Sequence, residues 1–415
     1  MHQGYVLYIS MNSRNILLRR YICKRLNEYY SQPSDSVVGS ISSNHSSTPR
    51  GINFPSLLNE WHWKYTYKRL YKEQKGMWLT PVELFYPYYS NILGNFITES
   101  IKRKHEDVFD IVELGGGRGT NAKAVLNHLN DSRPEMYDRL QSYTIYDTSP
   151  SLHELQRKVL IDDSSHADKV KLVNIDMMDI AEGKTPFLEP SDTPTALIAL
   201  ELLDNLPHDK IARCIQTDNI LQAEIIPLDS LESSDQIDTS IPYRETFTPL
   251  SDPLIQHILS LTSSYNPTIS QGARWVPTVA LGILLRLFEC RPNSSLMFAD
   301  FDWLPLPDVD QNFIEKTIGD PLVTDMNGND HPSYLTSPPD ALCDILFPTD
   351  FSRMQTFGTK VIEQSNNNFI VISMKQRDFL MKYGADEVSK TKGWSGYSPL
   401  TDDFGNCSAL TITPR

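Results

Sequence analysis

Four glycines within five residues constrain most strongly how this chain of 415 residues can fold. They follow a short apolar run that contains Ile111, Val112 and Leu114, and alanine, valine and leucine recur at helical spacing after them. This order predicts a buried strand, a tight turn and a helix start, the first unit of a doubly wound α/β sheet. Glycine suits the turn because it adopts positive φ and lets a ligand approach the backbone. The helix N-terminus offers N–H groups to that ligand.

The spacing of the glycines separates two classes of ligand. A dinucleotide-binding turn reads G-x-G-x-x-G, whereas Gly115, Gly117 and Gly119 read G-x-G-x-G, with Thr120 where the third dinucleotide glycine would fall. An acidic residue, Glu113, stands two residues before the first glycine. The pattern E-x-G-x-G-x-G resembles motif I of the class I S-adenosylmethionine (SAM) methyltransferases. On this motif alone, a plain glycine turn in another α/β protein stays an open alternative.

Two predicted strands after the glycine turn end in an acid. The run from Ser142 ends at Asp147, where nucleoside-binding α/β folds place a carboxylate that accepts hydrogen bonds from the ribose hydroxyls. The run from Lys171 ends at Asp176, and Met177 follows it. In SAM enzymes that corner usually lies against the adenine. We therefore expect Asp147, Asp176 and Met177 to bind the cofactor.

A fourth strand and the residues after it predict the open edge of the same cleft. Thr195 to Glu201 is almost continuously apolar, as expected of a strand covered on both faces, and it leads into Asp204 and His208. The carboxyl ends of the strands border the ligand site in such sheets. We expect later sheet strands at 294–300 and 368–375.

A helix is predicted to begin at Thr80, to lead into the glycine-rich strand and to cover the cofactor cleft. Thr80 is the expected N-cap, Pro81 suits the first helical position, and Glu83 takes the third. Residues 51–105 also alternate aromatic and basic side chains. Such interleaving occurs in platforms for single-stranded nucleic acid, but the acidic balance of the chain favours an amphipathic helix lying on the domain.

Charge and cysteine spacing exclude several classes of protein. A formal net charge of −14 argues against nucleic-acid binding, which needs a basic footprint. No apolar run reaches the roughly 18 residues of a membrane span. The five cysteines lie far apart without a C-x-x-C pair, which indicates reduced or buried thiols instead of zinc ligands or disulfides.

The first fifty residues have the composition of a mitochondrial targeting segment. Met1 to Asn27 contains no acid and five basic residues among apolar ones, and a serine-rich stretch follows. An acid-free, Arg-rich leader before a polar linker is typical of a transit peptide, although a disordered basic tail is the alternative. Translation from Met11 would give a cleaner leader. We expect a matrix protein whose mature charge, −14 − 5 = −19, suits a basic partner.

The chain divides into five predicted parts. A transit peptide and linker cover 1–50, a helical segment covers 51–108, and the SAM-methyltransferase α/β domain covers 109–227 and 273–385. Residues 228–272, rich in serine, aspartate and proline, are predicted to form a substrate-side insertion, and 386–415 a C-terminal tail.

Several separated motifs together resemble the mitochondrial dysfunction protein A family, whose animal members assist respiratory complex I assembly as protein arginine methyltransferases. The matching motifs are Thr80-Pro81-Val82-Glu83, Val112 to Thr120, Ser149-Pro150-Ser151-Leu152, Leu200 to Pro207, Ala299-Asp300-Phe301-Asp302, and Asp344 through Asp350-Phe351. Leu200 replaces the family's usual asparagine and Asp302 its glycine, which indicates a divergent member. The resemblance implies SAM as cofactor and a protein substrate with an arginine segment.

An arginine substrate would be a cation, so carboxylates must orient it. Glu201 and Asp204 are the predicted clamp, Asp300 and Asp350 could complete an acidic pocket, and His208 could accept a proton. The competing interpretation is that Asp204, His208 and Asp350 only cap turns or helices.

Two other functions stay open at this point. The departures at Leu200 and Asp302 are compatible with a non-catalytic assembly factor that keeps the methyltransferase fold. A nucleotide-dependent dehydrogenase is disfavoured by the missing G-x-G-x-x-G. The sequence predicts neither the oligomeric state nor the methylated product.

Overall fold

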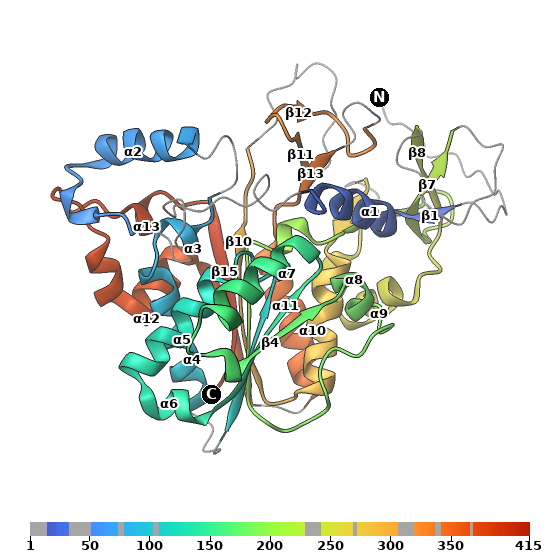
Figure 1. Ribbon diagram of the computed structural model, residues 1–415. Helices are drawn as coiled ribbons and strands as arrows, with labels where there is room; N and C mark the ends of the chain where they lie inside the picture. The colour runs from blue at the N-terminus through green and yellow to red at the C-terminus, as the bar shows by residue number, and fades with distance from the viewer. Residues whose placement is uncertain are drawn as a thin grey trace.

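A seven-stranded sheet forms the centre of the protein, with helices on both of its faces (Figure 1). The computed structural model describes residues 15–32, 51–73, 79–102, 108–228, 242–268, 272–305, 319–336, 342–365 and 368–415. The sheet has the order β14-β15-β10-β5-β2-β3-β4. Its strands are β2 (Phe109–Leu114), β3 (Leu140–Asp147), β4 (Val170–Asn174), β5 (Thr195–Leu200), β10 (Ser294–Phe301), β14 (Phe369–Lys375) and β15 (Cys407–Pro414).

The direction of the strands confirms the predicted fold class. The strands β4, β3, β2, β5 and β10 pair in parallel, and the reversal of strand order beside β2 is that of a doubly wound α/β sheet. Strand β15 runs antiparallel to both β10 and β14. The segment 386–415, expected as a C-terminal tail, therefore supplies an inner strand of the sheet, and that expectation is corrected.

Two apolar clusters hold the helices against the sheet. Helices α4 (Tyr88–Lys102), α5 (Thr120–Ser132) and α12 (Gln376–Lys390) bury one face through residues such as Ile97, Leu126 and Phe379. Helices α8 (Met177–Ala181), α10 (Thr278–Cys290) and α11 (Phe351–Gln364) bury the other through residues such as Leu281 and Met354. The shorter helices are α6 (Pro134–Arg139), α7 (Pro150–Arg157), α9 (Pro253–Leu261) and α13 (Pro399–Asp402).

The helical segment before the sheet follows its sequence pattern in part. Helix α2 (Glu60–Glu73) buries Trp63 and Leu70, as an amphipathic helix on the domain should. The helix expected to begin at Thr80 is divided instead. Helix α3 (Pro81–Leu84) ends at Leu84, with Phe85 as its C-cap, and α4 begins at Tyr88. None of the described helices is both long and apolar enough to cross a bilayer.

Two smaller sheets lie beyond the carboxyl edge of the central one. The first joins β1 (Ile16–Leu17), β6 (Asp209–Arg213), β7 (Ile220–Pro227), β8 (Tyr243–Pro249) and β9 (Arg274–Val276). The second joins β11 (Leu322–Asp325), β12 (Asp330–His331) and β13 (Cys343–Leu346). Apart from β1, the strands of the first sheet run from Asp209 to Val276, so the inserted region is wider than the predicted 228–272.

Helix α1 (Leu18–Tyr30) packs on these sheets through Leu18, Tyr21 and Ile22. Its Arg19 is 2% exposed and forms ion pairs with Glu182 at 2.8 Å, Asp209 at 2.9 Å and Asp252 at 2.7 Å. Cleavage after Asn27 would remove this cation from three carboxylates, so a leader that includes 15–27 does not fit the packing. The rest of the predicted leader and linker, 1–14 and 33–50, lies outside the described residues, and mitochondrial targeting stays a prediction.

Candidate active site

The glycine loop joins β2 to α5 in the predicted way. Gly115, Gly117 and Gly119 all have positive φ, of 67°, 51° and 84°. The N–H of Gly115 donates to the carbonyl of Tyr146, and that of Gly119 to the carbonyl of Gly116, at 2.9 Å each. A Cβ on Gly115 would lie 3.0 Å from Leu202, whereas a Cβ on Gly117 would meet nothing within 4 Å. The loop is therefore tightly turned yet open at Gly117.

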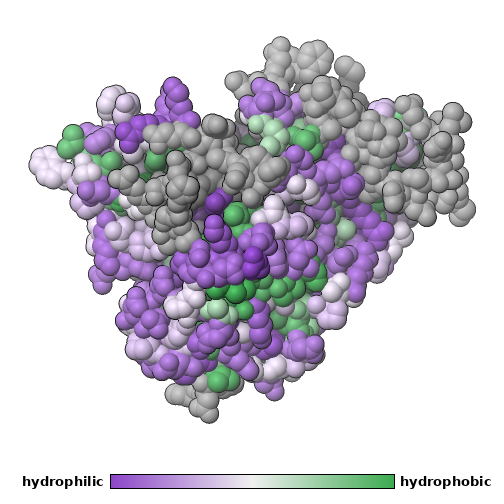
Figure 2. All heavy atoms as spheres, in the orientation of Figure 1, coloured by the Kyte–Doolittle hydropathy of each residue, from purple (hydrophilic) through white to green (hydrophobic). Residues whose placement is uncertain are grey.

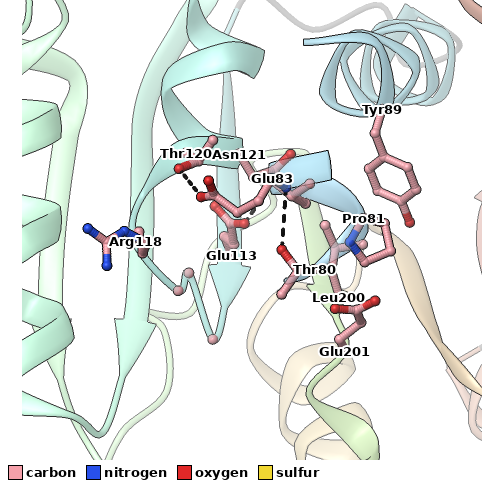
Figure 3. A pocket seen from close by; sticks show the side chains of 14 residues that line it. Thr80, Pro81, Glu83, Tyr89, Glu113, Arg118, Thr120, Asn121, Leu200 and Glu201 are labelled. Carbon is pink, nitrogen blue, oxygen red and sulfur yellow. Dashed lines mark hydrogen bonds between the residues drawn. The ribbon is translucent and has the colours of Figure 1, made fainter. Parts of the chain in front are cut away.

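A pocket opens between this loop, α3 and the end of β5 (Figure 3). Its lining includes seven of the predicted site residues: Thr80, Glu83, Glu113, Gly115, Gly117, Thr120 and Glu201. Tyr89, Arg118, Asn121 and Leu200 also line it, and Arg118 points away from the other labelled side chains (Figure 3). The pocket lies where β2 and β5 end, the edge at which doubly wound sheets bind their ligands.

Helix α3 is tied to the glycine loop by Glu83. Thr80 caps α3, since its hydroxyl accepts a hydrogen bond from the N–H of Glu83 at 3.4 Å. The carboxylate of Glu83 accepts a hydrogen bond from the hydroxyl of Thr120, at the start of α5 (Figure 3). The bond from Thr120 to Glu83 therefore holds α3, one wall of the pocket, against the start of α5. The sequence predicted both Thr80 and Glu83 here.

Glu113 supports the loop from below. Its two oxygens accept hydrogen bonds from the Asn121 amide and the Tyr143 hydroxyl, both at 2.8 Å. Burial raises the pKa of Glu113 to about 7, because a low-dielectric environment disfavours the charged form. Its bonds indicate a role in shaping the loop.

Asp147 ends β3 as predicted, but its oxygens already have protein donors. One accepts from the N–H of Ser149 and the other from the side-chain amide of Gln156, both at 3.0 Å. Burial raises the pKa of Asp147 to about 6, and the residue is not part of the pocket lining. A ribose hydroxyl would have to share an oxygen with Gln156.

Sequence reasoning missed Gln156 as a site residue. The fully buried amide nitrogen also donates to the carbonyl of Gly117 at 2.9 Å, so it joins the glycine loop to the end of β3. The amide oxygen of Gln156 is buried without a partner among the described residues. The sequence does offer one signal for Gln156: it lies seven residues after Ser149, the N-cap of α7, and so on the helix that follows Asp147.

Three other predicted cofactor residues lie away from the pocket lining. Asp176 caps α8 and accepts hydrogen bonds from the Cys23 thiol and the Asn27 amide of α1. Met177 is 5% exposed and packs in the core with α10. Gly119 precedes α5 as its N-cap.

Three predicted acids meet beside the pocket. Glu201 lines it and has an unusual φ of 49°, while Asp300 accepts a hydrogen bond from the N–H of Asp204 at 3.1 Å. A fourth acid, Asp344, was not predicted as a site residue. It accepts hydrogen bonds from the Asn205 amide at 2.7 Å and the Tyr30 hydroxyl. We call Glu201, Asp204, Asp300 and Asp344 the acid cluster.

Three members of the acid cluster, Asp204, Asp300 and Asp344, are buried, and Glu201, which lines the pocket, is half-buried. Burial raises the pKa of Asp300 and Asp344 to about 7 and holds that of Glu201 and Asp204 well above the ordinary value. In the part of the chain that the structure describes, no lysine or arginine pairs with any of the four. One oxygen of Asp204 is buried there without a hydrogen-bond partner.

His208 and Asp350 lie in a different groove, near the ends of β10 and β14. The His208 ring stacks on Phe347 with centroids 4.0 Å apart, and its Nδ1 donates to the carbonyl of Leu206 at 2.8 Å. Burial lowers the pKa of His208 to about 4, so the ring is neutral. Asp350 caps α11 and pairs with Arg353 at 2.9 Å, as the capping interpretation expected.

The pocket residues fit an adenosyl ligand. Gly117 lines the pocket, and a Cβ at this position would project into open space. Gln156 lies outside the pocket lining, where its unpartnered amide oxygen can accept from a hydroxyl or amine. Glu201 lines the pocket and also belongs to the acid cluster.

Comparisons with known proteins place the chain among S-adenosyl-L-methionine-dependent methyltransferases. The sequence model of a family described as "Putative S-adenosyl-L-methionine-dependent methyltransferase" matches residues 92–369, more than half of the chain. A crystal structure of a "likely methyl transferase" from Burkholderia thailandensis, bound to S-adenosyl-homocysteine, is similar with a TM-score of 0.60 and 13% identity. The match covers 96% of this chain and 88% of the Burkholderia chain.

A second structure, of an uncharacterized protein from Burkholderia thailandensis, has a TM-score of 0.55 and 14% identity, and covers 97% of this chain and 88% of its own. These structures share the fold. No curated protein matches the chain. By its sequence match, and in keeping with the geometry of its glycine pocket, the chain belongs to this family of S-adenosyl-L-methionine-dependent methyltransferases.

Proposed function

We propose that this methyltransferase transfers the methyl group to a guanidinium nitrogen of an arginine in a protein substrate. The observation that carries the proposal is the acid cluster, which is largely buried beside the cofactor pocket and has no paired cation among the described residues. A buried carboxylate with a raised pKa ionises when a cation arrives next to it. A guanidinium is a permanent cation with donors that match carboxylates in geometry.

Different residues of the chain would position the cofactor and the guanidinium. S-adenosylmethionine supplies an electrophilic methyl group on a sulfonium. The loop at Gly117 and the α3 wall at Thr80 and Glu83 hold the cofactor. Glu201, shared by the pocket and the acid cluster, orients the guanidinium toward the cofactor and localises its charge on the nitrogens that do not react. Such orientation contributes about 7–11 kcal/mol to lowering a barrier between two reactants.

The test compares methyl transfer with cofactor binding. Purified protein is given methyl-labelled SAM and arginine-containing protein substrates, and the product is analysed for methylarginine. Glu201→Gln is expected to lower the transfer rate roughly a hundredfold, as loss of one oriented electrostatic group does, while S-adenosylhomocysteine affinity changes little. Labelled lysine or a small molecule in place of methylarginine would contradict the arginine substrate.

A matched pair of glycine variants separates binding from activity. Gly117→Val places a side chain in the pocket, whereas Gly328→Val imposes the same kind of positive-φ strain, at φ 81°, in an open turn elsewhere. Gly117→Val is expected to abolish calorimetric binding of S-adenosylhomocysteine and Gly328→Val to retain it. Binding without any transfer in the unaltered protein would favour the non-catalytic assembly factor.

The proposal also includes where the protein acts in the cell. The motifs shared with the mitochondrial dysfunction protein A family support a role in respiratory complex assembly inside mitochondria. Localisation of the tagged full-length protein, and the level of assembled respiratory complexes after deletion of its gene, test that role. A cytosolic protein with normal complexes after deletion would overturn it.

A further inference from the structure

We infer that the outer face of helix α2 docks the protein on an anionic lipid bilayer. The face carries four large apolar side chains that are mostly exposed: Leu58 by 59%, Trp61 by 78%, Tyr65 by 62% and Trp394 by 85%. Lys68 and Lys72 are exposed next to them on the same helix. We call these six residues the α2 surface.

The fold brings the six residues together. Trp61, Tyr65, Lys68 and Lys72 follow one another at spacings of four, three and four, so they share one side of the helix. Trp63 and Leu70 point the other way into the core. The N–H of Trp394 donates to the carbonyl of Leu57 at 2.8 Å, which holds the loop after α12 against the start of α2.

The position of α2 leaves this side open. The helix lies at the periphery of the protein, away from the central sheet, on the same side as the carboxyl ends of the parallel strands (Figure 1). In the space-filling view, hydrophilic and pale residues gather over α2 at the upper left (Figure 2). Docking through α2 would therefore hold the mouth of the active site near the bilayer.

The chemistry of the surface fits a bilayer interface. Trp and Tyr prefer the level of the lipid headgroups, and lysines attract anionic lipids. An amphipathic helix with these two features lies in the plane of the interface. Helix α2 contains four basic and two acidic residues, a net charge of 4 − 2 = +2, in a chain of net charge −14. The positive charge is therefore local to the helix.

Single-stranded nucleic acid is the other anionic partner that aromatic and basic residues can bind. Two observations favour the bilayer. Leu58 offers no ring on which a base could stack, and the aromatic residues lie at the beginning of the helix while Lys68 and Lys72 lie toward its end. A bilayer interface can bind both ends of such a helix, because the aromatic end enters the headgroup region and the lysines contact anionic lipids.

The test measures co-sedimentation of the full-length protein with vesicles. We expect binding to vesicles of phosphatidylcholine mixed with phosphatidylserine, and weak binding to phosphatidylcholine alone. The double variants W61S/W394S and K68E/K72E are each expected to lower binding to the anionic vesicles at least about tenfold. The matched control W303S alters a tryptophan that is 61% exposed in another part of the protein, and it should bind normally.

Calorimetric binding of S-adenosylhomocysteine by each variant confirms that it is folded. The inference is overturned if the protein ignores anionic vesicles, or if both double variants bind them as well as the control does. Binding of a single-stranded oligonucleotide through the α2 surface, without binding to vesicles, would also overturn it.

Discussion

Gln156 shows how one buried amide can organise a binding site. Its nitrogen serves two acceptors at once, the carbonyl of Gly117 and the carboxylate of Asp147. Without this donor, the buried carboxylate of Asp147 and the half-buried carbonyl of Gly117 would each lose a hydrogen bond. Because the same side chain contacts the loop and the expected ribose acid, the shape of the pocket depends on it.

Gln156→Leu is expected to lower the free energy of unfolding by about 1–3 kcal/mol, since it leaves buried polar groups without a partner. It should also weaken S-adenosylhomocysteine binding, because the glycine loop loses its tie to β3. Urea denaturation and calorimetric titration measure the two effects. Glu154→Gln, on the exposed side of the same helix, is the control and should change neither. Unchanged binding in Gln156→Leu would show that the Gln156 amide does not shape the cofactor pocket.

Local and distant partners explain which site residues the sequence could predict. Thr80, Glu83, Gly117 and Glu201 follow from spacing within one turn or strand end, and they line the pocket. The oxygens of Asp147 are taken by partners that its position in a strand could not reveal. Asp344 joins the acid cluster through Tyr30, which is 314 residues away, and no local pattern encodes that contact.

At the scale of elements, α1 joins parts of the fold that are far apart in the chain. Arg19 pairs with acids that lie 163, 190 and 233 residues later. A buried ion cluster of this kind is strongly destabilised when one partner is removed, because the remaining charges stay buried without compensation.

Arg19→Met is expected to lower the free energy of unfolding by about 3–5 kcal/mol. Arg20→Met is the matched control. Its guanidinium side chain is 48% exposed and 3.6 Å from Glu182, so the loss should be at most about 1 kcal/mol. Urea denaturation of the two variants checks the difference. Equal, small losses would show that the Arg19 cluster contributes little to stability.

The elements predicted from the sequence were those with a strong local pattern. The apolar runs predicted β2, β3, β4, β5, β10 and β14 close to their observed bounds. Helix α1 has the Arg-rich, acid-free composition of a leader, and the burial of Arg19 becomes visible only with its distant acids in place. Strand β15 was assigned to a tail because its partners, β10 and β14, are separate in the chain.

At the scale of the whole molecule, the acid cluster makes stability depend on pH. Burial raises the pKa of Asp300 and Asp344 to about 7, whereas an unfolded aspartate titrates near about 4. Between these values the unfolded chain releases protons that the folded protein retains. The contribution of each group to the free energy of unfolding therefore falls as pH rises through this window, and levels off above it.

Asp344→Asn is expected to make the free energy of unfolding depend less steeply on pH. From pH 5 to pH 7, the unaltered protein should lose stability relative to the variant by up to about 1.4 kcal/mol per pH unit. Urea denaturation at a series of pH values, with both proteins in the same buffers, measures the difference. Parallel curves would mean that Asp344 titrates normally in the folded protein.

The place of β15 between β10 and β14 has a consequence for synthesis. Phe301, at the end of β10, precedes Cys407, at the start of β15, by 407 − 301 = 106 residues. At a translation rate of about 5–20 residues per second, the open side of β10 waits roughly 5–20 s for its neighbour. During that interval the nascent chain presents an unpaired apolar strand, the kind of edge on which chains stick to one another. Production of this protein should therefore depend on chaperones that shield β10 on the ribosome.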